Sequence, residues 1–267
     1  LKNYLGIFDS GIGGISVLKR VLERHGDLPC IYLADTARVP FGNKEPSEIR
    51  SIAIELIQWL KEENVSIVLV ACNTTNSLAL DLVKRISDVP VLDLISSTAM
   101  LINESRVGVL ATPATAASGS YGSAIKSMKP GTFVIEQGCP AFVELIEAGK
   151  LESEEIKSSA KEYLSPLLSA KVESIVLGCS HYPFLEPVLR QLLPSNVRLV
   201  DPAIGLASCL DNLLGGKKRK PQAPITFANT RFCTTSSPES FSKKLKALIG
   251  RSPQVDMVSL RSKAHFF

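Results

Sequence analysis

The chain has 267 residues, of which 45% are hydrophobic, and its formal net charge at pH 7 is +4. This length and composition support one large or two medium globular domains, and the mixed charges give no sign of a nucleic-acid partner. The longest apolar run, residues 67–72, is far below the roughly 20 residues that span a bilayer, which excludes a transmembrane helix and, with no signal-like pattern at residues 1–4, favours a cytoplasmic protein.

Strand and helix signals alternate in the first third of the chain. Short β-branched runs predict strands, and apolar residues at helical spacing predict helices. The predicted strands are residues 4–8, 30–34, 66–70 and 90–93, and the predicted helices begin near residues 15 and 46 and close near residue 86. This β-α order predicts a parallel sheet covered by helices, with ligands near the carboxyl ends of the strands.

The same pattern repeats from about residue 95. The predicted strands are residues 106–111, 132–136, 174–178 and 197–200, and the predicted helices are 113–127, 141–148, 152–168, 182–192 and 201–214. No linker of low complexity separates the two halves. We therefore expect an α/β protein with two pseudo-symmetric lobes, each a mainly parallel sheet flanked by helices, and an active site between them.

The last part of the chain differs from the rest. The basic run Lys217–Lys220 lies between glycines and a proline and lacks interleaved aromatic residues, so we interpret it as a solvated loop rather than a nucleic-acid site. After it come predicted strands at 225–228, 231–233 and 255–258 and a helix at 238–248. This tail could return to complete the first lobe, which would then consist of residues 1–95 plus 207–267, with residues 96–206 as the second.

Two stretches share one plan in which a Ser-Ile-Val-Leu run leads to a cysteine and then to polar residues. Asn73-Thr74 follow Cys72, and Ser180-His181 follow Cys179. A thiol at the turn before a helix can have a lowered pKa and act as a reactive group. A buried cysteine can also serve only as a small core residue, but packing gives no reason for the polar residues after both. Because the six cysteines form no C-x-x-C pair, we expect no zinc ribbon or redox dithiol.

A glycine-rich turn, D-S-G-I-G-G at residues 9–14, follows the first predicted strand. A dinucleotide site would need the spacing G-x-G-x-x-G, and Asp9 would repel a pyrophosphate. A small zwitterion fits better, with its ammonium group near Asp9 and its carboxylate near the backbone amides of the turn.

Two thiols on opposite sides of one carbon can invert that carbon. One sulfur, as a thiolate, takes a proton from one face while the other delivers a proton to the opposite face, and the roles swap in the reverse reaction. His181 lies two residues after Cys179 and could hydrogen-bond its sulfur or the substrate. The matched cysteines therefore favour a racemase.

Five motifs closely resemble those of the glutamate racemase family: D-S-G-I-G-G (9–14), V-P-F-G (39–42), A-C-N-T (71–74), C-P-A-F-V-E-L-I-E-A-G (139–149) and G-C-S-H-Y-P (178–183). The resemblance covers most of residues 5–206 and is weakest in the tail. It implies a cofactor-independent and metal-free interconversion of L- and D-glutamate that supplies D-glutamate for peptidoglycan, in a cytoplasmic homodimer.

The resemblance also implies the site. Cys72 would take the proton from D-glutamate and Cys179 from L-glutamate, assisted by Asp9, His181 and Glu147. The expected substrate contacts are Asp9, Ser10, Phe41, Gly42, Asn73, Thr74, Thr115, Ser180 and His181. Phe41 and Ser180 depart from the tyrosine and threonine usual in the family, which bears on affinity more than on the reaction. Aspartate racemase, a related cofactor-free racemase or decarboxylase, and a non-catalytic amino-acid-binding protein are the alternatives.

Overall fold

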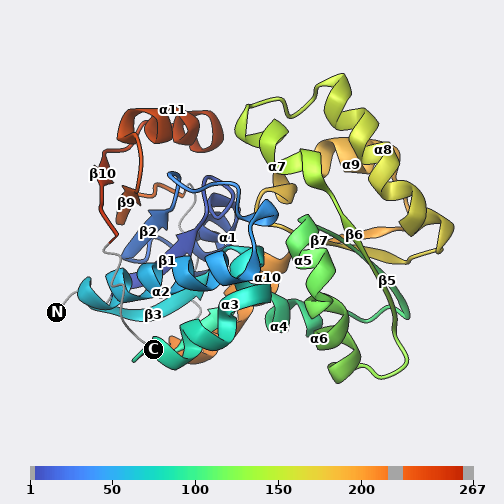
Figure 1. Ribbon diagram of the computed structural model, residues 1–267, viewed down its shortest axis with the longest axis horizontal. Helices are drawn as coiled ribbons and strands as arrows, with labels where there is room; N and C mark the ends of the chain where they lie inside the picture. Colours follow the sequence, from blue (N-terminus) through green and yellow to red (C-terminus); the bar gives the residue numbers. More distant parts are fainter. Residues whose placement is uncertain (1–3, 216–224, 261–267) are drawn as a thin grey trace.

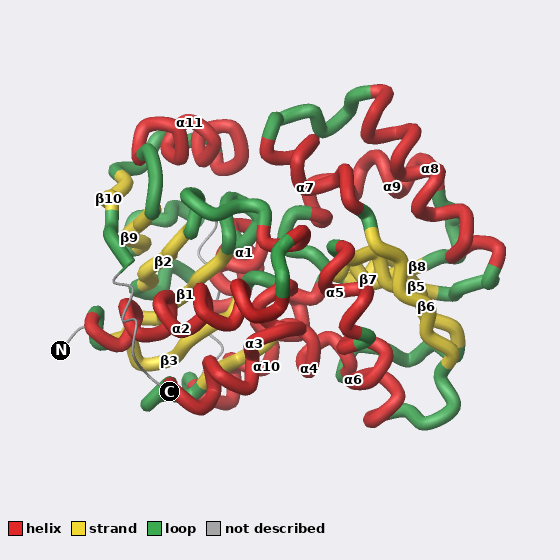
Figure 2. Tube along the Cα trace, in the orientation of Figure 1, coloured by secondary structure: helices red, strands yellow, loops and turns green. Residues whose placement is uncertain are grey.

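The computed structural model describes residues 4–215 and 225–260, and the predicted loop at Lys217–Lys220 lies outside them. The described chain forms two parallel sheets, each flanked by helices, which Figure 1 shows on either side of a central junction. In the tube of Figure 2 the strands of the two sheets stand apart, separated by helices and loops. The predicted fold class is confirmed. None of the helices in the described ranges combines the length and apolar character needed to cross a membrane.

The first sheet has the strand order β10-β9-β2-β1-β3-β4, and all neighbours are parallel. Its strands are β1 (Tyr4–Asp9), β2 (Cys30–Ala34), β3 (Val65–Val70), β4 (Val91–Asp93), β9 (Thr230–Thr234) and β10 (Val255–Met257). The helices of this part are α1 (Ile15–His25), α2 (Pro46–Glu62), α3 (Asn73–Ile86), α4 (Leu94–Ala99), α10 (Pro202–Leu213) and α11 (Pro238–Ile249), with a 3₁₀ turn η1 (Phe41–Asn43). Apolar stripes of α1, α10 and α11 form one core with the sheet, while α2 and α3 form another.

The second sheet has the order β6-β5-β7-β8 and is also parallel throughout. Its strands are β5 (Arg106–Ala111), β6 (Phe133–Gly138), β7 (Ser174–Gly178) and β8 (Arg198–Val200). The accompanying helices are α5 (Pro113–Ser118), α6 (Ser120–Met128), α7 (Pro140–Glu147), α8 (Glu154–Ser169) and α9 (Glu186–Leu192), with a 3₁₀ turn η2 (Tyr182–Leu185).

The two sheets repeat one topology. In each, the first strand is central, the second pairs on one side of it, and the third pairs on the other side, so that β2-β1-β3-β4 corresponds to β6-β5-β7-β8. Parallel α/β sheets bind ligands at the point where the strand order changes direction beside the central strand, outside the carboxyl ends of the strands. Cys72 follows β3 and Cys179 follows β7, so both cysteines lie at equivalent strand ends beside this point.

The tail returns to the first sheet, where β9 pairs with β2. The predicted strand at 225–228 is wrong: Ile225 and Phe227 pack against the first core, but Phe227 has a left-handed φ of 55°, which breaks the extended backbone. The division of the chain at residues 95/96 and 206/207 stays a prediction, because α4 and α10 pack against each other where the two parts meet.

Two predicted helices are each divided. Residues 113–127 form α5 and α6, because Gly119 between them has a left-handed φ of 64°. Residues 182–192 begin as the 3₁₀ turn η2 and continue as α9, since Pro187 has no amide hydrogen to donate to the preceding turn.

Candidate active site

Both cysteines line one narrow pocket at the carboxyl ends of β3 and β7. Its walls come from both halves of the molecule, and about 240 Å³ of space free of protein atoms, part of it open to solvent, lies between them. The lining residues are Ser10, Phe41, Gly42, Cys72, Asn73, Thr74, Thr112, Val143, Cys179, Ser180 and His181. Nine of these eleven are residues that the sequence indicated. The three remaining predicted residues lie directly behind the lining, where Asp9 bonds to Ser180, Thr115 to Thr112 and Glu147 to His181.

Cys179 and His181 form a buried pair. The Cys179 Sγ lies 3.8 Å from the His181 Nδ1, and the His181 Nε2 lies 2.8 Å from the Glu147 Oε1. Burial opposes the charged form of the imidazole, but the Cys179 sulfur and the Glu147 carboxylate outweigh it and raise the pKa of His181 to about 10. At neutral pH the site therefore holds an imidazolium ion beside the Cys179 sulfur.

Cys72 has the opposite electrostatic environment, although it is the N-cap residue of α3. Burial and the nearby Asp9 charge raise the pKa of Cys72 to about 12. The expected lowering of the pKa by the helix N-terminus is wrong for this thiol, because desolvation of the charged form outweighs the helix dipole. The site therefore contains a neutral thiol on one side and, on the other, a sulfur paired with a cation.

Asp9 ends β1 and is completely buried. Its Oδ2 accepts hydrogen bonds from the backbone amides of Gly11 (3.2 Å) and Gly14 (2.9 Å), and its Oδ1 accepts one from the Ser180 hydroxyl (3.1 Å). Burial raises the pKa of Asp9, although these donors and the His181 charge oppose the shift. The expectation that the turn amides meet the substrate carboxylate is wrong for these two amides, since Asp9 occupies them. The same contact blocks a phosphate.

The two departures from the family motifs keep their places in the site. The Phe41 ring is buried, and Gly42 lies so close to Thr112 that an added Cβ would be 2.6 Å from the Thr112 Cβ. The Ser180 hydroxyl makes the bond to Asp9, which needs no methyl group. Phe41 can therefore contact a ligand only with its ring or backbone, whereas Ser180 retains its polar role.

A hydroxyl and amide network forms the wall near α3. The Thr112 hydroxyl lies 3.1 Å from that of Thr74 and donates to that of Thr115 at 2.9 Å, so Thr115 supports the lining from behind. The Tyr121 hydroxyl donates to the Asn73 Oδ1 at 2.5 Å, while the buried Asn73 Nδ2 has no hydrogen-bond partner within residues 4–215 and 225–260. A buried unpaired donor is costly, so an acceptor group of a bound molecule would stabilise this side chain.

Tyr121→Phe should raise KM several-fold with a smaller change in kcat. Without the phenol hydroxyl, the amide of Asn73 loses the bond that fixes its orientation in the pocket wall, which weakens binding of ground state and transition state alike. Steady-state kinetics with each enantiomer of the expected substrate measure this. A fall in kcat at unchanged KM would contradict a binding role for Asn73.

Sequence reasoning missed Thr112 and Val143. Thr112 directly follows the predicted strand 106–111, so its position at a carboxyl end was a usable signal. Val143 gave no such signal, because it lies within the amphipathic pattern of α7 and only the packing of that helix turns it toward the pocket.

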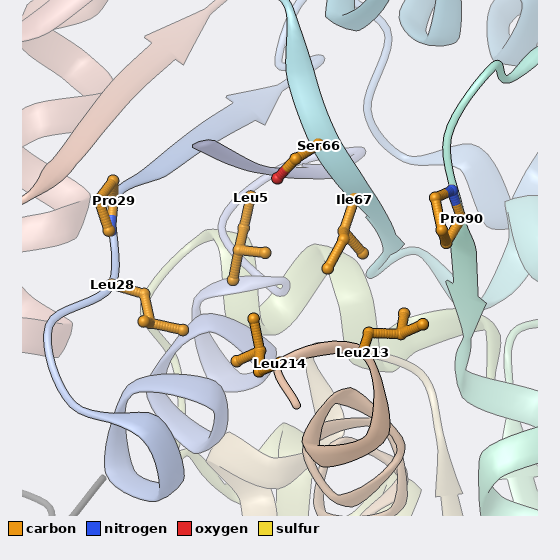
Figure 3. Close-up of a pocket in the computed structure, with 8 residues that line it drawn as sticks. All are labelled: Leu5, Leu28, Pro29, Ser66, Ile67, Pro90, Leu213 and Leu214. Carbon is orange, nitrogen blue, oxygen red and sulfur yellow. The ribbon is translucent and has the colours of Figure 1, made fainter. Parts of the chain in front are cut away.

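A second hollow lies at the opposite, amino-terminal end of the first sheet, and Figure 3 shows its lining. The lining residues are Leu5, Leu28, Pro29, Ser66, Ile67, Pro90, Leu213 and Leu214. None of these side chains is an acid or a base at neutral pH, so this hollow cannot support proton transfer. In the described part of the chain, no group of three or more His, Cys, Asp or Glu side chains is arranged to hold a metal ion.

Known proteins are similar to this chain in sequence and architecture. The profile of the Asp/Glu/hydantoin racemase family matches residues 13–209, which leaves α11 outside the match. The glutamate racemase of Synechococcus sp. (strain CC9605) is 51% identical over 255 residues, which cover 95% of this chain and 96% of that protein. The crystal structure of glutamate racemase from Francisella tularensis in complex with D-glutamate is 32% identical, with a TM-score of 0.88 over 98% of this chain and 99% of that one. A Pyrococcus horikoshii aspartate racemase homologue, 21% identical with a TM-score of 0.56 over 80% of this chain and 99% of that one, shares the fold alone.

Proposed function

We propose that this chain, which belongs to the Asp/Glu/hydantoin racemase family and is an enzyme of the glutamate racemase type, interconverts L- and D-glutamate. In this proposal the reaction uses two thiols, Cys72 and Cys179, and no cofactor. The observation that carries this mechanism is that both thiols line one pocket from equivalent ends of two repeated sheets. A bound α-carbon between them would have one sulfur on each face.

The electrostatic difference between the two sides suits the first step. With L-glutamate bound, the Cys179 sulfur acts as the base, with the His181 imidazolium beside it: as a thiolate it accepts the α-proton, and the electron pair of the broken C–H bond stays on carbon. The Cys72 thiol then gives its proton to the opposite face, which forms D-glutamate and leaves Cys72 as the thiolate. D-glutamate reacts in reverse from that state, and proton exchange with solvent interconverts the two states.

The α-proton of an amino acid is a very weak acid, so the pocket must stabilise the carbanionic transition state. Exclusion of water and preorganised donors do this. Among the described residues, the unpartnered Asn73 Nδ2 is a donor suited to the substrate carboxylate. Asp9 is suited to the ammonium group. We further propose that the reaction supplies D-glutamate for peptidoglycan. The enzyme would act in the cytoplasm as a homodimer.

Circular dichroism of the purified protein with each enantiomer of glutamate and of aspartate, without pyridoxal phosphate, tests this function. We expect the glutamate signal to decay to zero from either side, because enantiomers have equal free energies in water. The aspartate signal should decay far more slowly. A glutamate signal that persists, or an aspartate signal that decays faster, would overturn the assignment.

A further inference from the structure

Glu147 is shared between the two halves of the molecule. It ends α7, beside the second sheet, and its Oε1 lies 2.8 Å from the His181 Nε2 and accepts the backbone amide of Ile12 at 3.3 Å. Its Oε2 accepts a hydrogen bond from the Nζ of Lys244, which lies on α11 beside the first sheet. One carboxylate thus joins Lys244 to the imidazole that faces Cys179.

The helix that carries Lys244 is firmly anchored. Phe241 and Leu245, on the buried face of α11, belong to the first core, and the Phe241 ring stacks on Tyr32 at 6.3 Å with an interplanar angle of 10°. Lys244 lies one turn from Phe241 and leaves the core toward α7. Figure 1 shows α11 and α7 as neighbours across the junction between the two sheets.

A second series of contacts links α11 to Glu147 through Tyr32, on which Phe241 stacks. The Tyr32 hydroxyl donates to the Gly11 carbonyl at 2.8 Å, which fixes the turn whose Ile12 amide bonds Glu147. This turn passes so close that a Cβ on Gly11 would lie 2.5 Å from the Glu147 Oε1. The carboxylate is therefore held between the turn on one side and Lys244 on the other.

We propose that Lys244 is a positioning residue of the racemase reaction: it holds the Glu147 carboxylate so that its Oε1 stays on the His181 Nε2 and the His181 Nδ1 stays on Cys179. This role rests on the proposed function. Glu147 keeps 14% of its side chain exposed and Lys244 keeps 38%. A carboxylate at this boundary has water as an alternative partner, and the ammonium group on its outer oxygen keeps it turned inward.

The charges around His181 make this role measurable. The groups that face the imidazole are Cys179 on its own turn, Glu147 on α7 with Lys244 behind it, and Asp9 at the end of β1. If Lys244 positions Glu147, its loss lets the carboxylate turn away, and the pKa of His181 falls. If Lys244 acted only as a distant positive charge, its loss would raise that pKa.

Lys244→Met is expected to lower kcat/KM roughly tenfold, as a displaced supporting group does, and to lower the His181 titration midpoint by about half a unit or more. Lys243→Met is the matched control, because Lys243 is the exposed neighbour on the same helix and the charge change is identical. Lys244→Arg should restore most of the activity, since it returns a cationic donor. The midpoint is read by ¹⁵N NMR of the imidazole, which is tractable in a chain with three histidines.

A double-mutant cycle with Glu147→Gln completes the test. The effects of Lys244→Met on kcat/KM and on the His181 midpoint should largely vanish in the Glu147→Gln background, because both substitutions break the same Lys244–Glu147 contact. A His181 midpoint that stays or rises in Lys244→Met, equal losses in Lys243→Met, or additive effects with Glu147→Gln would each overturn the proposal. The NMR readout needs no turnover, so an inactive wild-type protein would refute the proposed function and still leave Lys244 testable.

Discussion

Cys72→Ser and Cys179→Ser should each lower kcat for glutamate racemisation by about 10³-fold, from either enantiomer. In the proposed mechanism every turnover needs one sulfur to accept a proton and the other to donate one, so neither direction survives the loss of either thiol. A serine hydroxyl fills nearly the same space but is a far weaker acid. The decay rate of the circular dichroism signal measures the loss, and Cys209→Ser, at a partly exposed cysteine outside the pocket, should keep full activity.

The two serine variants should differ in a one-sided reaction. Elimination of HCl from 3-chloroglutamate needs a base for the α-proton, while the electron pair forms the double bond and chloride leaves, so no second acid is required. Cys72→Ser should therefore still process the L-configured compound through Cys179, and Cys179→Ser the D-configured one through Cys72. Normal racemisation by both variants would refute the mechanism, and ligand binding without turnover in the wild type would favour a non-catalytic binding protein.

Gly13→Ala should lower kcat/KM by about 10²-fold, the scale of loss that small misplacements of catalytic groups cause. An added methyl group would collide with the His181 Nδ1 and lie 2.5 Å from the Ser180 Oγ. Both neighbours are buried and bonded, His181 to Glu147 and Ser180 to Asp9, so the turn and the second half of the molecule must separate. Steady-state kinetics measure the loss.

The effect of Gly13→Ala on stability should be small, because the first core does not depend on this contact. Thermal unfolding within a few degrees of wild type would therefore accompany the loss of activity. Gly122→Ala is the control, since its methyl group would meet the end of the Glu136 side chain at 3.1 Å and make only ordinary contacts with Val134, at 3.7 Å or more. Full activity in Gly13→Ala would show that the two halves do not need this close approach.

The sequence predicted much of the fold and the pocket through one physical regularity. Strands of a parallel sheet end at the same edge, so polar residues directly after buried runs converge there. This places Asp9, Cys72 and Cys179 together although up to 170 residues separate them, the separation being 179 − 9. Thr112 follows the same rule and could have been included.

Features that depend on long-range packing were beyond local patterns. Lys244 lies in a tail whose return to β2 a sequence only suggests, and nothing near it in the chain indicates that Glu147 is its partner. The sequence also could not predict that the Gly11 and Gly14 amides bond to Asp9. The same residues could equally form a turn whose amides are free to bind a ligand. Burial decided the high pKa of Cys72 in the same way.

Racemisation in deuterated water tests the two-thiol mechanism most directly, because each sulfur exchanges its proton with solvent. When D-glutamate is the substrate, L-glutamate formed in the first turnovers should carry deuterium at the α-carbon, while the remaining D-glutamate should carry almost none. The reaction from L-glutamate should give the mirror-image result. Product that retains the substrate's own α-proton, or substrate that gains deuterium as fast as product forms, would show that a single base serves both faces and would contradict a site built on Cys72 and Cys179.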